Sequence, residues 1–126
     1  MFKPQFAPLV KSGAKRQTIR PIPKRMPKVG DHESWRQWEQ LELARVELTS
    51  IEPVTIIPCQ VVVERTSDGI YSLSGDELSA FARADGFEGS VAFFEWFNDN
   101  HGLPFEGILI KAKDLVNPNH FADQVE

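Results

Sequence analysis

With 126 residues, 41% of them hydrophobic and 25% charged, the chain has the size and composition of one globular, cytoplasmic domain. A single cysteine excludes an internal disulfide, the three histidines are scattered, and no apolar run approaches the length of a membrane span. We therefore expect no metal, no cofactor and no membrane association. The net charge of −4 hides an asymmetry, because residues 1–30 hold eight of the fourteen Lys and Arg and no acidic residue. Such a basic segment is typical of proteins that bind nucleic acid or another polyanion.

The N-terminal part is predicted to contain a short strand, a helix and an extended basic segment. Phe2–Lys3 reads as the strand, and a helix over 5–11 is stopped by Gly13, which adopts the left-handed conformation at little cost. Residues 15–20 are expected to be extended because a proline follows them. Further prolines then predict an irregular basic loop that ends in a Gly30-Asp31 turn.

The middle of the chain has the pattern of β-structure. Leu43 and Val46 break the alternation of apolar and polar residues, which predicts a β-bulge between them. Asp68-Gly69 is a strong hairpin signal. The predicted strands cover residues 34–38, 41–51, 54–57, 60–64 and 70–71.

Two helices and a last strand complete the domain. Ser74 and Glu77 fit a capping box for a helix that ends near Asp85-Gly86, and Ser90 is predicted to cap a second helix that runs to about Asn100. Residues 105–112 are predicted to form the final strand. We expect an α+β domain over residues 1–113, with mostly antiparallel strands closing on themselves and helices at the edges, and a loose tail over 114–126.

Most of the candidate binding residues lie in the basic segment. Lysines and arginines around a concave site would neutralise phosphates, and the amide of Gln17 could read a base edge. Trp35, Trp38 or Phe87 could stack on a base, although tryptophans are more often core residues and single cations are more often solvated surface charges. The predicted ligand-binding set is Arg16, Gln17, Arg20, Lys24, Arg25, Lys28 and Trp35.

The run Gly13-x-Lys15-x-x-Thr18-Ile19-Arg20, followed by Gly30-Asp31, resembles the ASCH domain superfamily. The resemblance is closest to the small bacterial ASCH enzymes that hydrolyse N4-acetylcytidine, and phage-encoded ASCH-like proteins have a corner similar to Asp85-Gly86-Phe87. It implies a PUA-like β-barrel with flanking helices and a ligand that is RNA or a modified nucleoside. It also implies that Lys15 and Thr18 are catalytic. The family's third catalytic group is a glutamate near the end of the helix that follows the barrel strands, and Asp85 stands at that corner here.

Amide hydrolysis would use Thr18 as the nucleophile, Lys15 as the base and Asp85 as the acid that protonates the leaving amine. Lys15 can act as a base only if its pKa is well below the usual value of about 10.4. Residues three apart on a regular strand face opposite sides, so this arrangement needs an irregular backbone near Lys15. Two alternatives stay open. One is a non-catalytic module that binds RNA or a nucleotide in the same pocket, and the other is a phage accessory protein that binds a protein partner through its acidic C-terminal half.

Overall fold

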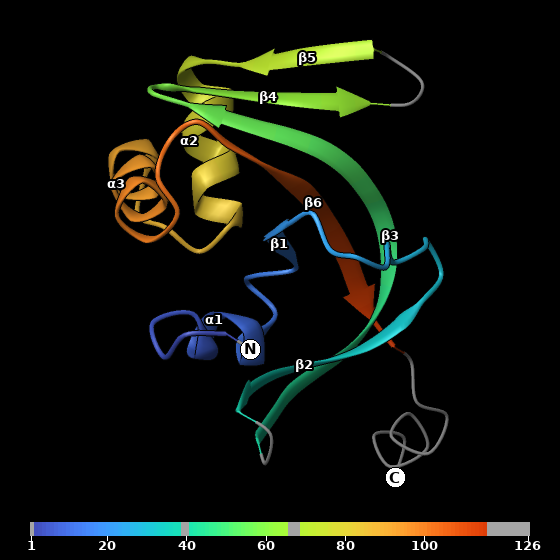
Figure 1. Cartoon of the computed structure of the whole chain (residues 1–126). Coiled ribbons are helices and arrows are strands. Elements are labelled where there is room, and N and C mark those ends of the chain that lie inside the picture. The colour runs from blue at the N-terminus through green and yellow to red at the C-terminus, as the bar shows by residue number, and fades with distance from the viewer. Residues whose placement is uncertain (1, 39–40, 66–68, 116–126) are drawn as a thin grey trace, which may run out of the picture.

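The computed structural model describes residues 2–38, 41–65 and 69–115, which form an α+β domain with a six-stranded antiparallel sheet and three helices (Figure 1). The predicted Asp68 turn and most of the predicted tail lie outside these residues. The elements in chain order are α1 (Ala7–Ser12), β1 (Gln17–Pro21), β2 (His32–Trp38), β3 (Leu41–Ile57), β4 (Gln60–Arg65), β5 (Gly69–Leu73), α2 (Gly75–Ala84), α3 (Ser90–Asn100) and β6 (Phe105–Asp114).

The sheet has the order β1-β6-β3-β4-β5, and β2 also pairs with β3. On one edge of β3, the pairing with β2 ends at Glu47 and the pairing with β4 starts at Val54. Both strands therefore use the same edge of one long, curved strand, and the sheet branches there (Figure 1). The expectation of a closed β-barrel is wrong, since β1 and β5 are the two ends of an open sheet.

The structure joins two predicted strands, 41–51 and 54–57, into the single strand β3. Pro53 pairs with β6 on one edge of β3, but it lies in the interval where neither β2 nor β4 pairs with the other edge. The N–H that proline lacks is therefore not needed for a hydrogen bond on that edge. A β-bulge is present at Leu43, at the start of the interval where one was predicted, because the register against β2 passes from Ala44 to Glu42 and skips Leu43. The local sequence pattern thus predicted an irregularity in β3, but it did not predict that residues 41–57 form one continuous strand.

Three predictions about local structure are wrong. Phe2–Lys3 is not a strand, although the Phe2 amide donates to the Arg36 carbonyl at 2.7 Å. Ser74 occupies the N-cap position of α2, but its side chain makes no capping hydrogen bond. The N-cap of α3 is Gly89, and Ser90 is the first helical residue. Both helices begin without a side-chain cap, so packing against the sheet holds them in place.

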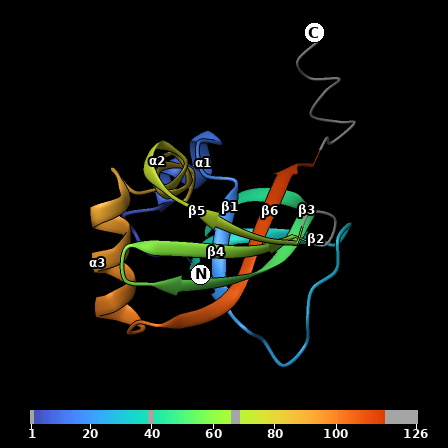
Figure 2. The ribbon, with the colours of Figure 1, turned by 90° about the horizontal axis from the view of Figure 1, so that it is seen from above.

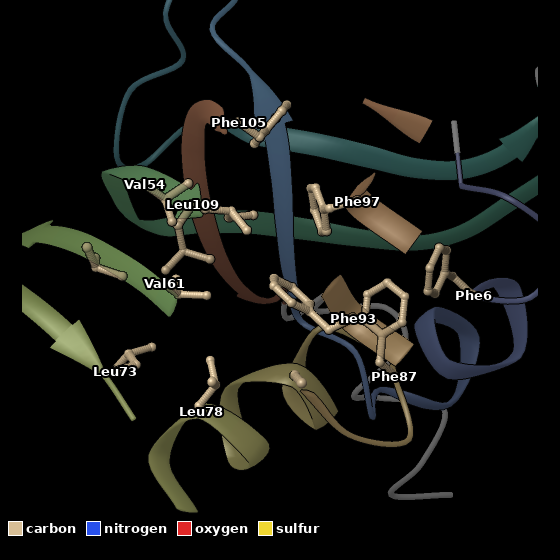
Figure 3. Packing of buried hydrophobic residues seen from close by; sticks show 13 residues of the cluster. Phe6, Val54, Val61, Leu73, Leu78, Phe87, Phe93, Phe97, Phe105 and Leu109 are labelled. Carbon is tan, nitrogen blue, oxygen red and sulfur yellow. The ribbon is translucent and has the colours of Figure 1, made fainter. Parts of the chain in front are cut away.

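Two hydrophobic clusters lie on opposite faces of β6. Leu109 belongs to the larger cluster, while its neighbours Ile108 and Ile110 belong to the smaller one, as the alternation of a strand requires. The smaller cluster contains Val10 of α1 and Trp35 of β2. The larger cluster is rich in phenylalanine rings from α3 and from the segment before it, and Figure 3 shows several of them beside β1. In Figure 1 all three helices lie inside the bend of the long strand β3, with α1 near the part that pairs with β2.

Among the described residues, no helix is long and apolar enough to cross a membrane.

Candidate functional site

A pocket of about 280 Å³ opens at the outer edge of β1, between the N-terminal segment, the C-terminal end of α2 and the side of α3. Its walls are mainly aromatic, and its polar groups are two lysines, an arginine, a threonine and an aspartate. The lining residues are Phe2, Lys3, Phe6, Lys15, Thr18, Ile19, Arg20, Asp85, Phe87, Trp96 and Phe97. An apolar cleft with a few polar groups is the usual form of a small-molecule site.

A buried ion pair lies in this pocket. The Lys15 ammonium nitrogen donates to the backbone carbonyl oxygen of Asp85 at 2.6 Å and to the Asp85 carboxylate oxygen Oδ1 at 3.2 Å. Their side chains are only 4% and 5% exposed. The two residues are 70 positions apart in the sequence, and the structure brings them together.

The end of α2 explains why the Asp85 carbonyl is available. The Gly86 amide bonds to the Arg83 carbonyl and the Phe87 amide to the Ala82 carbonyl, which is the hydrogen-bond pattern of a Schellman motif. Gly86 has the left-handed φ of +98° that this motif requires. The Lys15 ammonium thus caps the negative end of the helix dipole as well as pairing with the carboxylate.

Lys15 is held in position by irregular backbone between α1 and β1. Gly13 ends α1 with φ +92°, as predicted, and the Lys15 amide then bonds to the Leu9 carbonyl at 3.0 Å. The ammonium lies over the Phe6 ring at 5.1 Å from its centroid and over the Phe2 ring at 5.8 Å. Aromatic faces stabilise a cation at such distances.

Burial shifts both members of the pair toward their neutral forms. Desolvation lowers the pKa of Lys15 below its ordinary value of 10.5, and the charge and hydrogen bond of Asp85 only partly oppose this. Desolvation raises the pKa of Asp85 to about 6, against the opposing effects of Lys15 and of a hydrogen bond from Gln17. Burial therefore reduces the difference between the two pKa values and with it the cost of moving the proton from Lys15 to Asp85.

Thr18 lines the same pocket, but its side chain is on the opposite face of β1 from that of Ile19. Thr18 is paired with Ile110 and Ile19 with Leu109, so the two side chains point toward different hydrophobic clusters. The Gln17 side chain is on the Ile19 side, where its amide donates to the Phe81 carbonyl at 3.5 Å. In the part of the chain that the structure describes, no hydrogen bond joins the Thr18 hydroxyl to Lys15.

The two arginines of the motif are engaged in ion pairs. Arg20 makes a two-pronged contact with the Glu33 carboxylate, at 2.8 and 3.2 Å, and the Trp35 indole donates to the same carboxylate at 3.1 Å. Arg16 donates to Asp114 at 2.8 and 3.0 Å. Trp35 is only 2% exposed within the smaller cluster and does not line the pocket. Of the predicted ligand-binding residues, Arg20 lines the pocket together with Lys15 and Asp85, and Gln17 contacts Asp85 from outside the pocket lining.

The remaining predicted binding residues, Lys24, Arg25 and Lys28, lie apart from the pocket. All three are exposed on the loop between β1 and β2, which swings away from the body of the domain (Figure 2). We call Lys24, Arg25 and Lys28 the basic loop.

Several pocket residues were not predicted from the sequence. Phe2, Phe6 and Trp96 form walls, while Lys3 lies over the Trp96 ring and donates to Asn100 at 2.7 Å. Phe6 and Phe87 meet edge to face at 5.2 Å, as Figure 3 illustrates. Among these aromatic residues, the sequence indicates a binding role only for Phe87, as a stacking residue. The others have no local signal, since an aromatic residue of a pocket wall has the same pattern as one of the core.

Within residues 2–38, 41–65 and 69–115, no three His, Cys, Asp or Glu side chains are grouped in a way that could hold a metal ion. No family model, no curated protein and no solved structure matches the chain.

Proposed function

We propose that this protein is an ASCH-like amidohydrolase that binds a modified nucleoside in the pocket and hydrolyses the acetyl amide of N4-acetylcytidine. The observation that carries the proposal is the buried Lys15–Asp85 pair in an aromatic pocket. The resemblance of residues 13–20 to that family supports the same assignment. The pocket volume, about 280 Å³, is near the lower end for small-ligand sites and suits a single base and its acyl group better than a run of nucleotides.

The pair can supply a base and an acid at once. When the shared proton is on Asp85, the lysine is a neutral amine and the aspartate is a carboxylic acid, and desolvation by burial lowers the free-energy cost of this form relative to the ion pair. Below about pH 6 both groups are protonated and the base is lost, while at high pH the acid is lost. A pair that holds one proton is therefore the working form.

In the proposed reaction the Thr18 hydroxyl attacks the acetyl carbonyl and Lys15 accepts the hydroxyl proton. Asp85 then donates its proton to the departing N4 nitrogen, which releases cytidine and leaves the acetyl group on Thr18. Water hydrolyses this ester with the pair again moving the proton, and acetate leaves. Thr18 lines the pocket, and substrate binding has to bring its hydroxyl within reach of the Lys15 amine.

Replacing Lys15 by methionine is expected to lower kcat/KM for N4-acetylcytidine by at least roughly 100-fold, because general acid–base catalysis is worth that much or more. The measurement is chromatographic detection of cytidine and acetate. Lys11→Met is the matched control, since Lys11 is an exposed lysine of α1 outside the pocket. Thr18→Val, which removes only the hydroxyl, should have a similar effect, and Thr18→Ser should retain activity. Absence of turnover by the unmodified protein would contradict the enzyme proposal.

A second candidate function is RNA binding through the basic loop, and the exposure of Lys24, Arg25 and Lys28 favours it. These cations are accessible to phosphates, whereas Arg16 and Arg20 are held by carboxylates. A non-catalytic nucleic-acid module would need only this loop and the pocket.

The double variant Lys24→Glu/Arg25→Glu is expected to weaken binding of a short single-stranded RNA. Each lost phosphate contact should reduce the salt slope of log K by about 0.7, so two lost contacts reduce it by about 1.4. A fluorescence titration at two salt concentrations measures both quantities. Lys11→Glu/Arg83→Glu changes the charge equally at exposed sites elsewhere. Equal effects of the two double variants would speak against a specific role of the loop.

A further inference from the structure

The outer edge of β1 presents backbone polar groups to the pocket. The Arg16 carbonyl accepts from the Ala112 amide at 2.9 Å, and the register continues with Thr18 opposite Ile110 and Arg20 opposite Ile108. In an antiparallel ladder, alternate residues exchange hydrogen bonds with the partner strand. The peptide groups of Thr18 and Arg20 thus face β6, and the N–H and C=O of Ile19 point away from it.

Ile19 is also a lining residue of the pocket. Among residues 2–38, 41–65 and 69–115, no turn, loop or side-chain hydrogen bond reaches its N–H or C=O, and the register with β6 directs both groups away from that strand. The outward-facing residues on either side of Ile19 are Gln17, which does not line the pocket, and Pro21, which has no N–H. This edge therefore offers one complete donor–acceptor pair at the pocket, from a single residue.

One such pair suits a heterocycle better than a peptide. An added strand needs a ladder of alternating donors and acceptors, and Pro21 interrupts that ladder after Ile19. The rings of Phe2, Phe6 and Trp96 line the same pocket, and flat apolar walls favour a planar ligand.

We propose that the Ile19 peptide recognises the base of the ligand: its N–H donates to ring nitrogen N3 and its C=O accepts from the N4 amino group of a cytosine-type base. This inference rests on the proposed function and adds the group that selects the base. N4-acetylcytidine retains one N–H beside N3, so the substrate and its product share this edge.

The first test compares three nucleosides on the unmodified protein by isothermal titration. Cytidine and 5-methylcytidine should bind alike, because the methyl group of the latter lies away from the N3/N4 edge. N4,N4-dimethylcytidine has no N4 donor and should bind about tenfold more weakly, the effect of one lost hydrogen bond. Equal affinities for the two methylated nucleosides would overturn the inference.

The second test changes the protein. Ile19→Pro removes the outward N–H without removing a hydrogen bond to β6, and edge strands tolerate proline at such positions. We expect it to bind cytidine about tenfold more weakly than Ile19→Val, which keeps the N–H. Circular dichroism checks that both variants fold, and the nucleoside series tests the inference even if Ile19→Pro does not.

The outcomes separate the two proposals. Cytidine binding that is insensitive to N4 methylation and to Ile19→Pro would refute the role of Ile19 and leave the proposed function standing. Selective binding without turnover of N4-acetylcytidine would refute the hydrolase and support the role of Ile19. No binding of any nucleoside at millimolar concentration would refute both.

Discussion

Lys15→Met should lower the free energy of unfolding by about 3–5 kcal/mol at neutral pH, because removing one partner of a buried ion pair leaves the other charge uncompensated. Asp85→Leu should have a comparable cost for the same reason. The double variant should lose less than either single variant, since it leaves no buried charge. Chemical denaturation of the three variants and the unmodified protein measures the free energies.

The two single variants should differ in their dependence on pH. In Lys15→Met, the pKa of Asp85 rises further above about 6, so the folded state holds a proton that the unfolded state releases above its ordinary pKa of 3.8. The stability of this variant should therefore recover as the pH falls toward 4. In Asp85→Leu, the pKa of Lys15 falls further below 10.5, so stability should recover as the pH rises toward 10. Parallel pH profiles, or losses below about 1 kcal/mol in both, would contradict a buried charged pair as the source of the effect.

Gly86→Ala is expected to destabilise the protein by about 2–5 kcal/mol. The left-handed backbone, with φ +98°, costs a residue with a Cβ about 1–2 kcal/mol. The added Cβ would also lie 2.9 Å from Cδ1 of Phe6 and 3.2 Å from Cδ of Lys15, and overpacking of this kind costs about 1–3 kcal/mol. The Phe6 ring cannot easily move away, because it packs against Phe87 and Trp96.

Gly102→Ala is the matched control for this substitution. Gly102 follows α3 with φ +79°, and a Cβ there meets no atom within 4 Å, so it incurs only the backbone cost. The difference in stability between the two variants, measured by thermal denaturation, gives the cost of the contacts of the new Cβ with Phe6 and Lys15. Gly86→Ala should also reduce turnover, because it displaces the Lys15 side chain. Equal destabilisation by both substitutions would contradict this prediction, because it would show that the Phe6 and Lys15 side chains move away from the new Cβ at no cost in stability.

Short-range patterns predicted most of the elements and part of the site. Gly13 stops α1 at the predicted place because a left-handed glycine is a local property of the backbone, and Leu43 marks the bulge because a skipped alternation is visible within a few residues. The same reasoning failed at Ser74 and Ser90, where packing holds the helix and the side-chain caps are absent. Lys15, Thr18 and Asp85 were all predicted as site residues, and all three line the pocket.

The chain's own sequence thus determined an α+β domain with a basic N-terminal segment and a lysine next to a helix-ending glycine. Only the tertiary structure decided that the sheet branches at β3 and does not close into a barrel, because both properties depend on pairing between strands that are distant in the sequence. It likewise decided that Lys15 is buried against Asp85, and this burial shifts both pKa values. The tertiary structure also distinguishes the basic residues from one another: Arg20 is paired with Glu33, whereas the basic loop is exposed. Charge is a property of the sequence, whereas the desolvation that makes a charge reactive depends on which residues the fold packs around it.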